Sequence, residues 1–382
     1  MKRTKAKQSK IKKIVITIII ILAIIGVSLY ISSEDAREWF DIYILRKEIM
    51  EDDLESIDLN SSEKNYVYAY GKYVVVLNNN KLKAYNSSAN NTHEHEITIT
   101  NPVFDSSEKY LCVGEENGTK IYLISGDNIL WQKDLEGDIF RINVNKNGYI
   151  SVIVKGNNNQ NIIYAIDKEG KELLKMYLSS TMALKAKVSN DNSMLAIAEM
   201  DTSGTIIKPK VKVISIEKAQ KDPKNSIINT YEGEGNHIVV DIEFQNKTDL
   251  VCMYDNYISI FKDGEEKRIE ISQDAIAADI NSKKCIVEVK EEPGDLFSAN
   301  TKIFIKNIQN KNENTYIAEN TLKKLYTKDE IIVANMGNEA IFLNTNGKLI
   351  KKYISKQEIQ DIVIGESIIG IIYKNKIEVF SI

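Results

Sequence analysis

The stretch IYLISGDNILWQKDL (residues 121–135) contains the unit from which most of the chain is built. An apolar segment leads into a Gly-Asp-Asn turn, and apolar and polar residues then alternate. This pattern is typical of two antiparallel β-strands joined by a tight turn. The same pattern recurs in YAIDKEGKELLKMYL (164–178), ISIFKDGEEKRIEI (258–271) and IFLNTNGKLIKKYI (341–354).

The spacing of these hairpins predicts the fold class. The last large apolar residue before each turn gives eight positions: Tyr85, Ile124, Ile166, Ile216, Phe261, Ile305, Leu343 and Phe380. Their separations are 39, 42, 50, 45, 44, 38 and 37 residues, and four-stranded propeller blades repeat at about 40–45 residues. Residues 54–382 show no helical period, unlike leucine-rich, ankyrin and tetratricopeptide repeats. We therefore predict an all-β, eight-bladed β-propeller, with seven blades as the alternative if one irregular unit merges with its neighbour.

The two ends of the repeat array predict how the ring closes. The last unit, residues 361–380, aligns with residues 66–85 but has three strands and ends before an outermost one. Residues 54–59 (LESIDL) resemble the outermost strands of other units, such as LWQKDL. We expect this segment to complete the last blade, because that pairing seals the ring and leaves no sheet edge exposed.

A basic tail and an apolar run precede the repeats. Residues 1–13 contain seven cations and no acids, and residues 14–31 read IVITIIIILAIIGVSLYI. A helix of this length, at about 1.5 Å per residue, just spans a hydrocarbon core of about 30 Å. We predict one membrane anchor at 14–31, with a cleaved signal peptide as the alternative. The positive-inside rule then places the tail in the cytoplasm and the propeller, residues 54–382, on the extracytoplasmic side of the cell membrane.

Residues 32–53 connect the anchor to the propeller. Trp39, Ile42 and Tyr43 recur near helical spacing, and Ser32 with Asp35 fits a capping box. We predict a juxtamembrane helix over 32–53. Three arrangements stay open: a stalk that continues the membrane helix, an amphipathic helix at the membrane interface, or a helix docked on the propeller.

Composition and charge limit the classes of partner. With 43% hydrophobic and 27% charged residues, the chain has the composition of a globular protein rather than a disordered one. The formal net charge of −4 divides into +7 for residues 1–13 and −11 for the remainder. An acidic domain is repelled by nucleic acid and by anionic lipid headgroups, so we expect neither to bind the propeller.

Two resemblances rest on these motifs. The segments ending in ILWQKDL and KELLKMYL resemble the repeats of pyrroloquinoline-quinone-type eight-bladed propellers. The order of basic tail, apolar helix, short helical segment and propeller is similar to that of an uncharacterised bacterial family, domain of unknown function family 5711. This second resemblance implies a membrane-tethered propeller and carries no known chemistry. The chain departs from quinone-dependent dehydrogenases because Trp131 alone stands at the docking position, and it lacks the Trp-Asp signature of intracellular propellers.

Residues with nucleophilic or metal-binding chemistry are few. Cys112, Cys252 and Cys285 are predicted to be small buried side chains on second strands, with contact between the last two left open. His93 and His95 in THEHE would face one side of a strand, but we interpret this stretch as an exposed turn and outer strand. The sequence has no nucleophile-elbow, phosphate-loop or CxxC motif. We therefore predict no catalytic residues, no metal site and no cofactor.

Two long connections between second and third strands are the candidate binding sites. They are EMDTSGTIIKPK (199–210) and KEEPGDLFSANT (290–301), and connections of this kind share one face of a propeller. We call it the loop face. Binding residues concentrate on loops held by a rigid scaffold, although chance variation in loop length is the competing interpretation. The candidate residues are Asp201, Lys208, Glu291, Glu292, Asp295 and Phe297.

The sequence thus favours a single-pass membrane protein whose extracytoplasmic propeller is a non-catalytic platform that binds or assembles a protein or an envelope polymer. The alternative is a cell-envelope lyase or hydrolase with acidic residues at the mouth of the propeller channel. A sensor stalk is a third possibility, although 13 cytoplasmic residues leave little room for an output. An enzyme requires converging acids with shifted pKa values near the channel, whereas a platform requires an apolar patch on the loop face.

Overall fold

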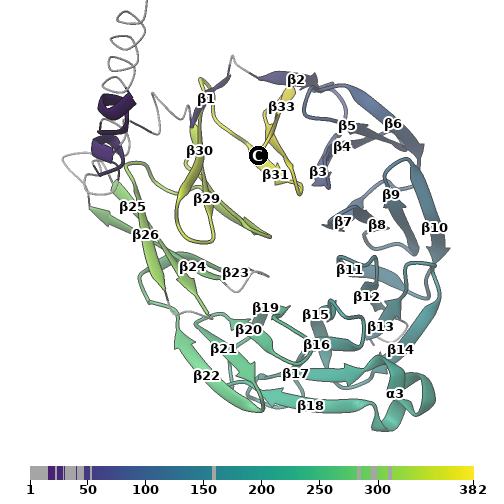
Figure 1. Cartoon of the computed structure of the whole chain (residues 1–382). Helices are drawn as coiled ribbons and strands as arrows, with labels where there is room; N and C mark the ends of the chain where they lie inside the picture. Colours follow the sequence, from purple (N-terminus) through teal and green to yellow (C-terminus); the bar gives the residue numbers. More distant parts are fainter. Residues whose placement is uncertain are drawn as a thin grey trace, which may run out of the picture.

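The computed structural model describes residues 16–21, 24–28, 30, 40, 47–51, 54–156, 161–281, 285–293, 299–308 and 312–382. The described strands form eight sheets around a common centre, so the chain is an eight-bladed β-propeller, as predicted (Figure 1). Consecutive strands of each blade follow one another outwards from the centre and pair antiparallel, and β1 (Glu48–Met50) and β2 (Glu55–Asp58) join the outer edges of the last two blades. We number the blades from one to eight in chain order.

The first four blades cover residues 66–232. Blade one contains β3 (Tyr66–Tyr70), β4 (Tyr73–Asn78), β5 (Lys81–Tyr85) and β6 (Asn91–Glu96). Blade two contains β7 (Pro102–Ser107), β8 (Tyr110–Glu115), β9 (Lys120–Ser125) and β10 (Asn128–Asp134). Blade three contains β11 (Asp138–Val144), β12 (Ile150–Lys155), β13 (Asn161–Ile166) and β14 (Glu172–Leu178). Blade four contains β15 (Met182–Val188), β16 (Met194–Asp201), β17 (Lys208–Ser215) and β18 (Ile227–Glu232).

The last four blades complete the ring. Blade five contains β19 (Val239–Phe244), β20 (Leu250–Tyr254), β21 (Tyr257–Lys262) and β22 (Glu265–Glu270). Blade six contains β23 (Ala275–Asn281), β24 (Cys285–Pro293), β25 (Ala299–Asn307) and β26 (Glu313–Ala318). Blade seven contains β27 (Lys324–Lys328), β28 (Ile331–Asn335), β29 (Glu339–Asn344) and β30 (Leu349–Ile354), and β1 (Glu48–Met50) joins it. Blade eight contains β31 (Asp361–Ile364), β32 (Ile368–Ile372), β33 (Lys376–Ser381) and β2 (Glu55–Asp58).

The core lies between neighbouring blades. The second and third strands are buried on both faces, as in β12 (ISVIVK) and β13 (NIIYAI), because each blade is covered by the next. One cluster, for example, joins Cys112 and Leu123 of blade two to Val152 and Tyr164 of blade three. Burying one such side chain contributes about 1.5–3 kcal/mol. The outermost strands alternate apolar and polar residues because one of their faces meets solvent.

Trp131 fastens blade two to blade three. Its indole N–H donates to the carbonyl of Lys168 over 3.1 Å. The ring lies so close to Gly170 that a Cβ there would meet it at 3.0 Å, and Gly170 has a φ of +83°. Glycine therefore suits this turn both in conformation and in space.

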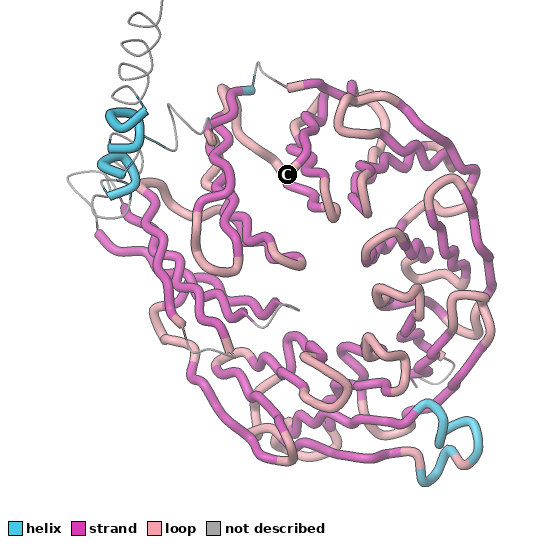
Figure 2. The backbone as a smooth tube through the Cα atoms, in the orientation of Figure 1, coloured by secondary structure: helices cyan, strands magenta, loops and turns pink. Residues whose placement is uncertain are grey.

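Blade four contains the described helical turns of the ring. The helix α3 (Ile216–Lys221) and the 3-10 turn η4 (Pro223–Asn225) lie at the outer rim between β17 and β18 (Figure 2). The Ser215 hydroxyl caps α3 by accepting from the backbone N–H of Lys218. Six residues are too few to show a helical period, which is why the sequence did not predict this helix.

The ring is closed by a strand from the start of the array. Residues of β2 pair antiparallel with β33, from Glu55 opposite Val379 to Asp58 opposite Lys376. This is the position expected for residues 54–59. Blade eight is therefore built from both ends of the repeat array, and the outer edge of β33 is paired with β2.

The helix predicted for residues 32–53 is wrong at its C-terminal end. Glu48–Met50 form β1, which pairs parallel with β30 from Glu48 opposite Lys352 to Met50 opposite Ile354. These residues add a fifth strand to blade seven because the unpaired edge of β30 offers backbone hydrogen bonds. Residues 32–39, 41–46 and 52–53 of the predicted helix lie outside the described residues.

Glu51, directly after β1, is the centre of a buried polar network. Its carboxylate is 8% exposed and accepts hydrogen bonds from Lys376 (2.8 Å) and from the side chain of Gln357 (2.8 Å). It also accepts from the backbone N–H of Lys356 (2.8 Å) and the Ser355 hydroxyl (3.1 Å). Although burial acts to raise it, these hydrogen bonds lower the pKa of Glu51 to about 2. The network joins the N-terminal segment to blades seven and eight.

The N-terminal region is described in part. Residues 16–21 and 24–28 are helical and carry exposed isoleucines. Phe40 packs edge-on against Tyr30, with ring centroids 6.1 Å apart, whereas ten residues of one straight helix span about 15 Å. Residues 30 and 40 are thus not parts of one straight stalk. In the described part of the chain, no helix is both long and apolar enough to cross a membrane.

Glu51→Gln tests the closure network. We expect the free energy of unfolding at neutral pH to fall by about 2–3 kcal/mol, because hydrogen bonds to a buried carboxylate are lost. Since the folded pKa of Glu51 lies below 4.5, its stabilisation is present above about pH 4.5 and is lost as the pH falls towards 2. Urea unfolding curves at pH 7 and pH 3 measure both effects.

The matched control is Glu313→Gln, which removes an ion pair with Lys306. The Glu313 side chain is 64% exposed. We expect a change within about 0.5 kcal/mol there. Equal effects of the two variants at pH 7 would show that the network does not stabilise the closure.

Candidate binding face and central channel

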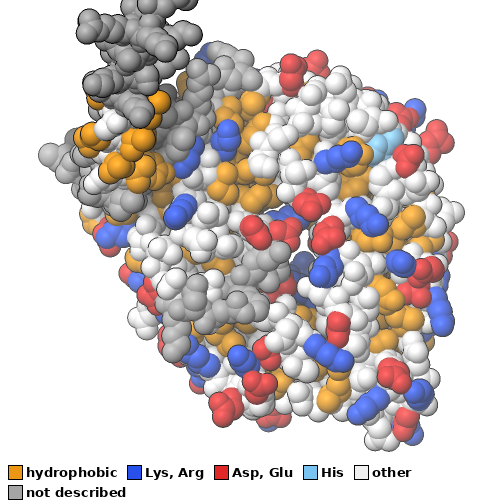
Figure 3. All heavy atoms as spheres, viewed as in Figure 1, with side chains coloured by type: hydrophobic (Ala, Val, Ile, Leu, Met, Phe, Trp, Pro, Cys, Tyr) orange, Lys and Arg blue, Asp and Glu red, His pale blue; other side chains and the backbone are white. Residues whose placement is uncertain are grey.

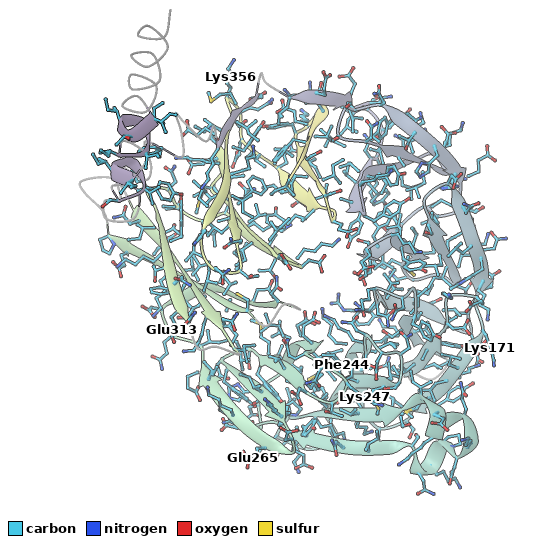
Figure 4. The ribbon with its side chains drawn as sticks, viewed as in Figure 1. Lys171, Phe244, Lys247, Glu265, Glu313 and Lys356 are labelled. Atoms are coloured by element: carbon cyan, nitrogen blue, oxygen red, sulfur yellow. The ribbon has the colours of Figure 1, made fainter. Side chains whose placement is uncertain are left out.

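The innermost strands of blades one to seven line a cavity of about 560 Å³ along the centre of the ring. Charged side chains dominate its wall, and Figure 3 shows acidic and basic groups gathered around the central opening. In Figure 4, Phe244 lies on the inner side of blade five, whereas Glu265 lies on its outer side. The charged wall residues with partners described below are Asp105, Lys185, Lys187, Asp241, Glu243, Asp279 and Lys328.

Lys187 is the centre of the charged wall. Its ammonium group lies 3.3 Å from Asp241 and donates to Glu243, and Lys185 lies 3.4 Å from Asp241. Burial acts to lower the pKa of Lys187, but Asp241 and Glu243 raise it above its ordinary value. Burial raises the pKa of Glu243. Ion pairs therefore join the inner strands of blades four and five.

Two other carboxylates reach from one inner strand to the next. Asp105 in blade two accepts from the backbone N–H of Val144 (2.7 Å) and the side chain of Asn143 (2.9 Å) in blade three. Asp279 in blade six accepts from the hydroxyl of Thr327 (2.7 Å) in blade seven. Burial raises the pKa of both acids.

Lys328 crosses the channel wall from blade seven to blade two. Its ammonium group donates to the Ser106 hydroxyl over 2.7 Å, and burial lowers the pKa of Lys328. The Ser106 hydroxyl in turn donates to the carbonyl of Ala69 in blade one over 3.0 Å. Because the hydroxyl proton is held by a carbonyl, this arrangement bridges three blades rather than activating a nucleophile.

The structure places the first predicted pair of binding residues at the tip of a hairpin. β16 and β17 continue into the 199–210 connection, and Asp201 lies directly opposite Lys208 in the ladder. Asp201 accepts hydrogen bonds from the backbone N–H (3.0 Å) and hydroxyl (2.7 Å) of Ser203, which lower its pKa. The connection predicted as a loop is therefore largely a longer hairpin.

The described members of the second group of predicted binding residues also lie on an extended hairpin. Glu291 and Glu292 lie on β24, opposite Thr301 and Asn300 of β25. Glu292 pairs with Lys302 at 2.7 Å, and Glu291 accepts from the backbone N–H of Leu322 over 3.2 Å. Asp295 and Phe297 lie outside the described residues. No contact that the structure describes brings this hairpin together with Asp201 and Lys208, so the predicted residues form two separate groups.

The histidines and cysteines have structural surroundings. His93 and His95 lie on β6, the outermost strand of blade one, as predicted, with ring centroids 5.3 Å apart. His95 is buried, so the exposed-turn part of the interpretation is wrong for it. The Nε2 atom of His95 lies 3.2 Å from the Gly126 carbonyl of blade two. All three cysteines are buried and free. Among the described residues, no three His, Cys, Asp or Glu side chains are placed to hold a metal ion.

Four consecutive inner strands carry a β-bulge at the same place. The register between first and second strands skips one residue in each of blades three to six, and each skipped residue is large and apolar: Phe140, Leu184, Val240 and Ile276. The corresponding pairs in blades one, two, seven and eight run without a skip. An extra residue bends the strand and re-aims side chains.

Two of the bulged residues, Val240 and Ile276, belong to an exposed apolar surface at the channel mouth. Inner strands begin on the loop face, and there Met182 (50% exposed), Val240 (42%) and Ile276 (49%) lie on the first strands of blades four to six, and Ile238 (40%) directly precedes β19. Ile206 (48%) extends this surface outwards, since it packs against Gly235 just before Ile238. We call these five residues the apolar arc.

Sequence reasoning missed both the charged wall and the apolar arc. A signal for the wall was present, because charged residues recur at alternate positions in KAK (185–187) and DIE (241–243), and a single acid ends AAD (277–279). Recognising it requires knowing which strand is innermost. The arc depends on bulges, and a single extra residue is invisible until the register of the two strands is known.

Comparison with known proteins yields a family and a fold. Residues 50–382 match the model of a family described as "Family of unknown function (DUF5711)". No curated protein matches the chain.

Solved structures are similar at low identity. Sqt1 from Chaetomium thermophilum has a TM-score of 0.54 at 12% identity, covering 86% of this chain and 100% of that one. A eukaryotic initiation factor has a TM-score of 0.51 at 12% identity, covering 84% and 86%. BamB from Moraxella catarrhalis has a TM-score of 0.47 at 12% identity, covering 86% and 99%. At such identities the likeness shows the propeller fold alone.

Lys187→Met tests the role of the charged wall. We expect a loss of about 3–5 kcal/mol in the free energy of unfolding at pH 7.5, because Glu243 loses its cation and Asp241 keeps only the more exposed Lys185. The raised pKa of Lys187 means that its own contribution is fully present below pH 10.5. In the variant, protonation of Asp241 and Glu243 relieves the loss, so the difference from the wild type shrinks as the pH falls.

Lys185→Met is the control, since Lys185 is 31% exposed and 3.4 Å from Asp241. We expect it to cost about 1 kcal/mol or less. Chemical denaturation at two pH values distinguishes the variants, and a pH-independent loss in Lys187→Met would contradict the electrostatic explanation.

Proposed function

The chain belongs to the DUF5711 family, whose function is unknown, and we propose that its propeller is a non-catalytic platform that binds a protein or an envelope polymer on the loop face. The observation that carries this proposal is the apolar arc. Large apolar side chains exposed on neighbouring strands of one face mark an interaction site, because water around them is released on binding.

The channel supports the same proposal. Its ion pairs and hydrogen bonds run between inner strands of adjacent blades, so they fasten the scaffold beneath the arc. A rigid scaffold lowers the entropy lost when a partner binds. In this view the charged wall holds the face in shape, and the apolar side chains make the contact.

We further propose that residues 14–31 anchor the propeller at the cell membrane on its extracytoplasmic side. Support comes from the sequence: the basic tail 1–13, the apolar run that follows it, and the net charge of −11 beyond it. A tethered platform gathers partners close to the membrane, because tethering raises their effective concentration.

A cell-envelope lyase or hydrolase is the second candidate. It is favoured by the raised pKa values of Asp105, Glu243 and Asp279 around an open channel, since a protonated carboxyl group is suited to general acid catalysis. Against it, each of these acids is held by a partner within the wall. Substitutions on the loop face that abolish partner capture while the wall residues stay intact would support the platform over the enzyme.

Site-specific photo-crosslinking in intact cells tests the platform. A photoreactive residue at Asp201, on the loop face, is expected to give one or a few discrete crosslinked products. The same residue at Lys247 is expected to give none of them, since Lys247 lies in the exposed turn between β19 and β20, and turns from first to second strands lie on the face opposite the loop face. Identical products from both positions, or none from Asp201, would contradict binding on the loop face.

A further inference from the structure

We propose that the apolar arc docks a basic amphipathic segment of a partner protein, with apolar side chains on the arc and a lysine or arginine side chain entering the channel between Asp241 and Asp279. This inference rests on the proposed platform function and names the chemistry of the partner. It commits to a cationic segment because of the charges directly beneath the arc.

The arc and the acids lie on the same inner strands. Val240 is followed at once by Asp241 on β19, and Ile276 is followed three residues later by Asp279 on β23. Both acids line the cavity. A segment resting on Val240 and Ile276 therefore places any long side chain that points inwards beside these two carboxylates.

The acids at the seam between blades five and six find their described partners on the far side of the seam. The contacts described above direct Asp241 to Lys185 and Lys187 of blade four, and Asp279 to Thr327 of blade seven, so each acid is bonded away from the seam. Burial and the charge of Asp241 raise the pKa of Asp279, whereas the Thr327 hydrogen bond and the charge of Lys187 lower it. A cation inserted here would relieve that repulsion and find a carboxylate on either side.

The space is sufficient for such a side chain. The cavity of about 560 Å³ reaches from Lys185 and Asp241, beside the bulges, to the turns of the opposite face. Lysine and arginine side chains are long enough to enter it while their stems cover apolar surface at the mouth. An anionic partner would meet Asp241 and Asp279 instead, and the net charge of −11 beyond residue 31 repels it at longer range.

Selection of peptides on the purified full-length protein provides the probe. We expect peptides enriched from a random phage-displayed library to combine large apolar residues with Lys or Arg. The best peptide, labelled with fluorescein, is then titrated by fluorescence anisotropy. Enriched peptides that are acidic, or that bind with an affinity independent of salt, would overturn the inference.

The arc variant Met182→Ser, Val240→Ser, Ile276→Ser is expected to weaken binding of this peptide by about 30-fold or more, since three partly exposed apolar side chains are lost. The matched control is Ile129→Ser, Leu130→Ser, Ile317→Ser, three side chains of similar exposure (37%, 42% and 56%) on outer strands. It should change the affinity less than twofold. Equal losses in both variants would overturn the docking site. Thermal unfolding checks that both proteins fold.

Asp279→Asn tests the inserted cation, because asparagine still accepts from Thr327 but carries no charge. We expect the affinity to fall by about fivefold or more and its salt dependence to weaken, while a peptide with its basic residues replaced by serine binds both proteins alike. An unchanged affinity would overturn the insertion of a cation.

Other occupants give different results. Self-association in sedimentation that disappears in the arc variant would show that a second copy of this chain, and not a partner segment, occupies the arc. Binding to phosphatidylglycerol vesicles that the arc variant loses would show that the arc contacts a membrane surface instead. If Asp201 gives photo-crosslinks but the selected peptides lack basic residues, this inference alone is overturned. If Asp201 gives no crosslinks, the platform itself is overturned.

Discussion

The pairing of β2 with β33 is the interaction on which the rest of the structure depends. A propeller blade buries its faces only against other blades, so every blade needs two neighbours and the ring has to close. Here the last blade takes its outermost strand from residues that precede the first blade. Glu51 adds a buried ionic lock at the same place, where Lys376 contacts both Glu51 and Glu378. Closure therefore links residues more than 300 positions apart.

Closure also explains the composition of the channel. Bringing eight inner strands to a common centre leaves a space too wide for aliphatic side chains to fill, so long charged side chains line it. Their desolvation is offset only when each charge finds an opposite one or a hydrogen-bond donor. The wall of this channel meets that condition by linking adjacent blades, as Lys187 does with Asp241 and Glu243. These charged residues, which taken one by one would suggest catalysis, thus act first by linking adjacent blades.

The ring itself was predictable from the sequence, because blade number and closure follow from spacing and strand periodicity. The three residues of β1 were not predictable, since a parallel edge strand adds no repeat and the local apolar spacing favours a helix. The candidate site was predicted only as a face. Asp201 and Glu292 were recognised as polar residues in long connections, but their partners Ser203 and Lys302 depend on hairpins that extend further than the turn signals suggested. The apolar arc depends on register, and register is a tertiary property.

The bulges between first and second strands lie away from the closure in the described register. Blades seven and eight contain the pairings of β1 and β2, and the first and second strands of blades seven, eight and one run without a bulge. Blades three to six contain all four inner-strand bulges of the described register, and two of them contain the long hairpins at 199–210 and 290–301. A slipped strand near the closure would expose the faces of blade eight, whereas a bulge elsewhere costs only a local hydrogen bond. The half of the ring that contains the inner-strand bulges is therefore also the half that contains the apolar arc.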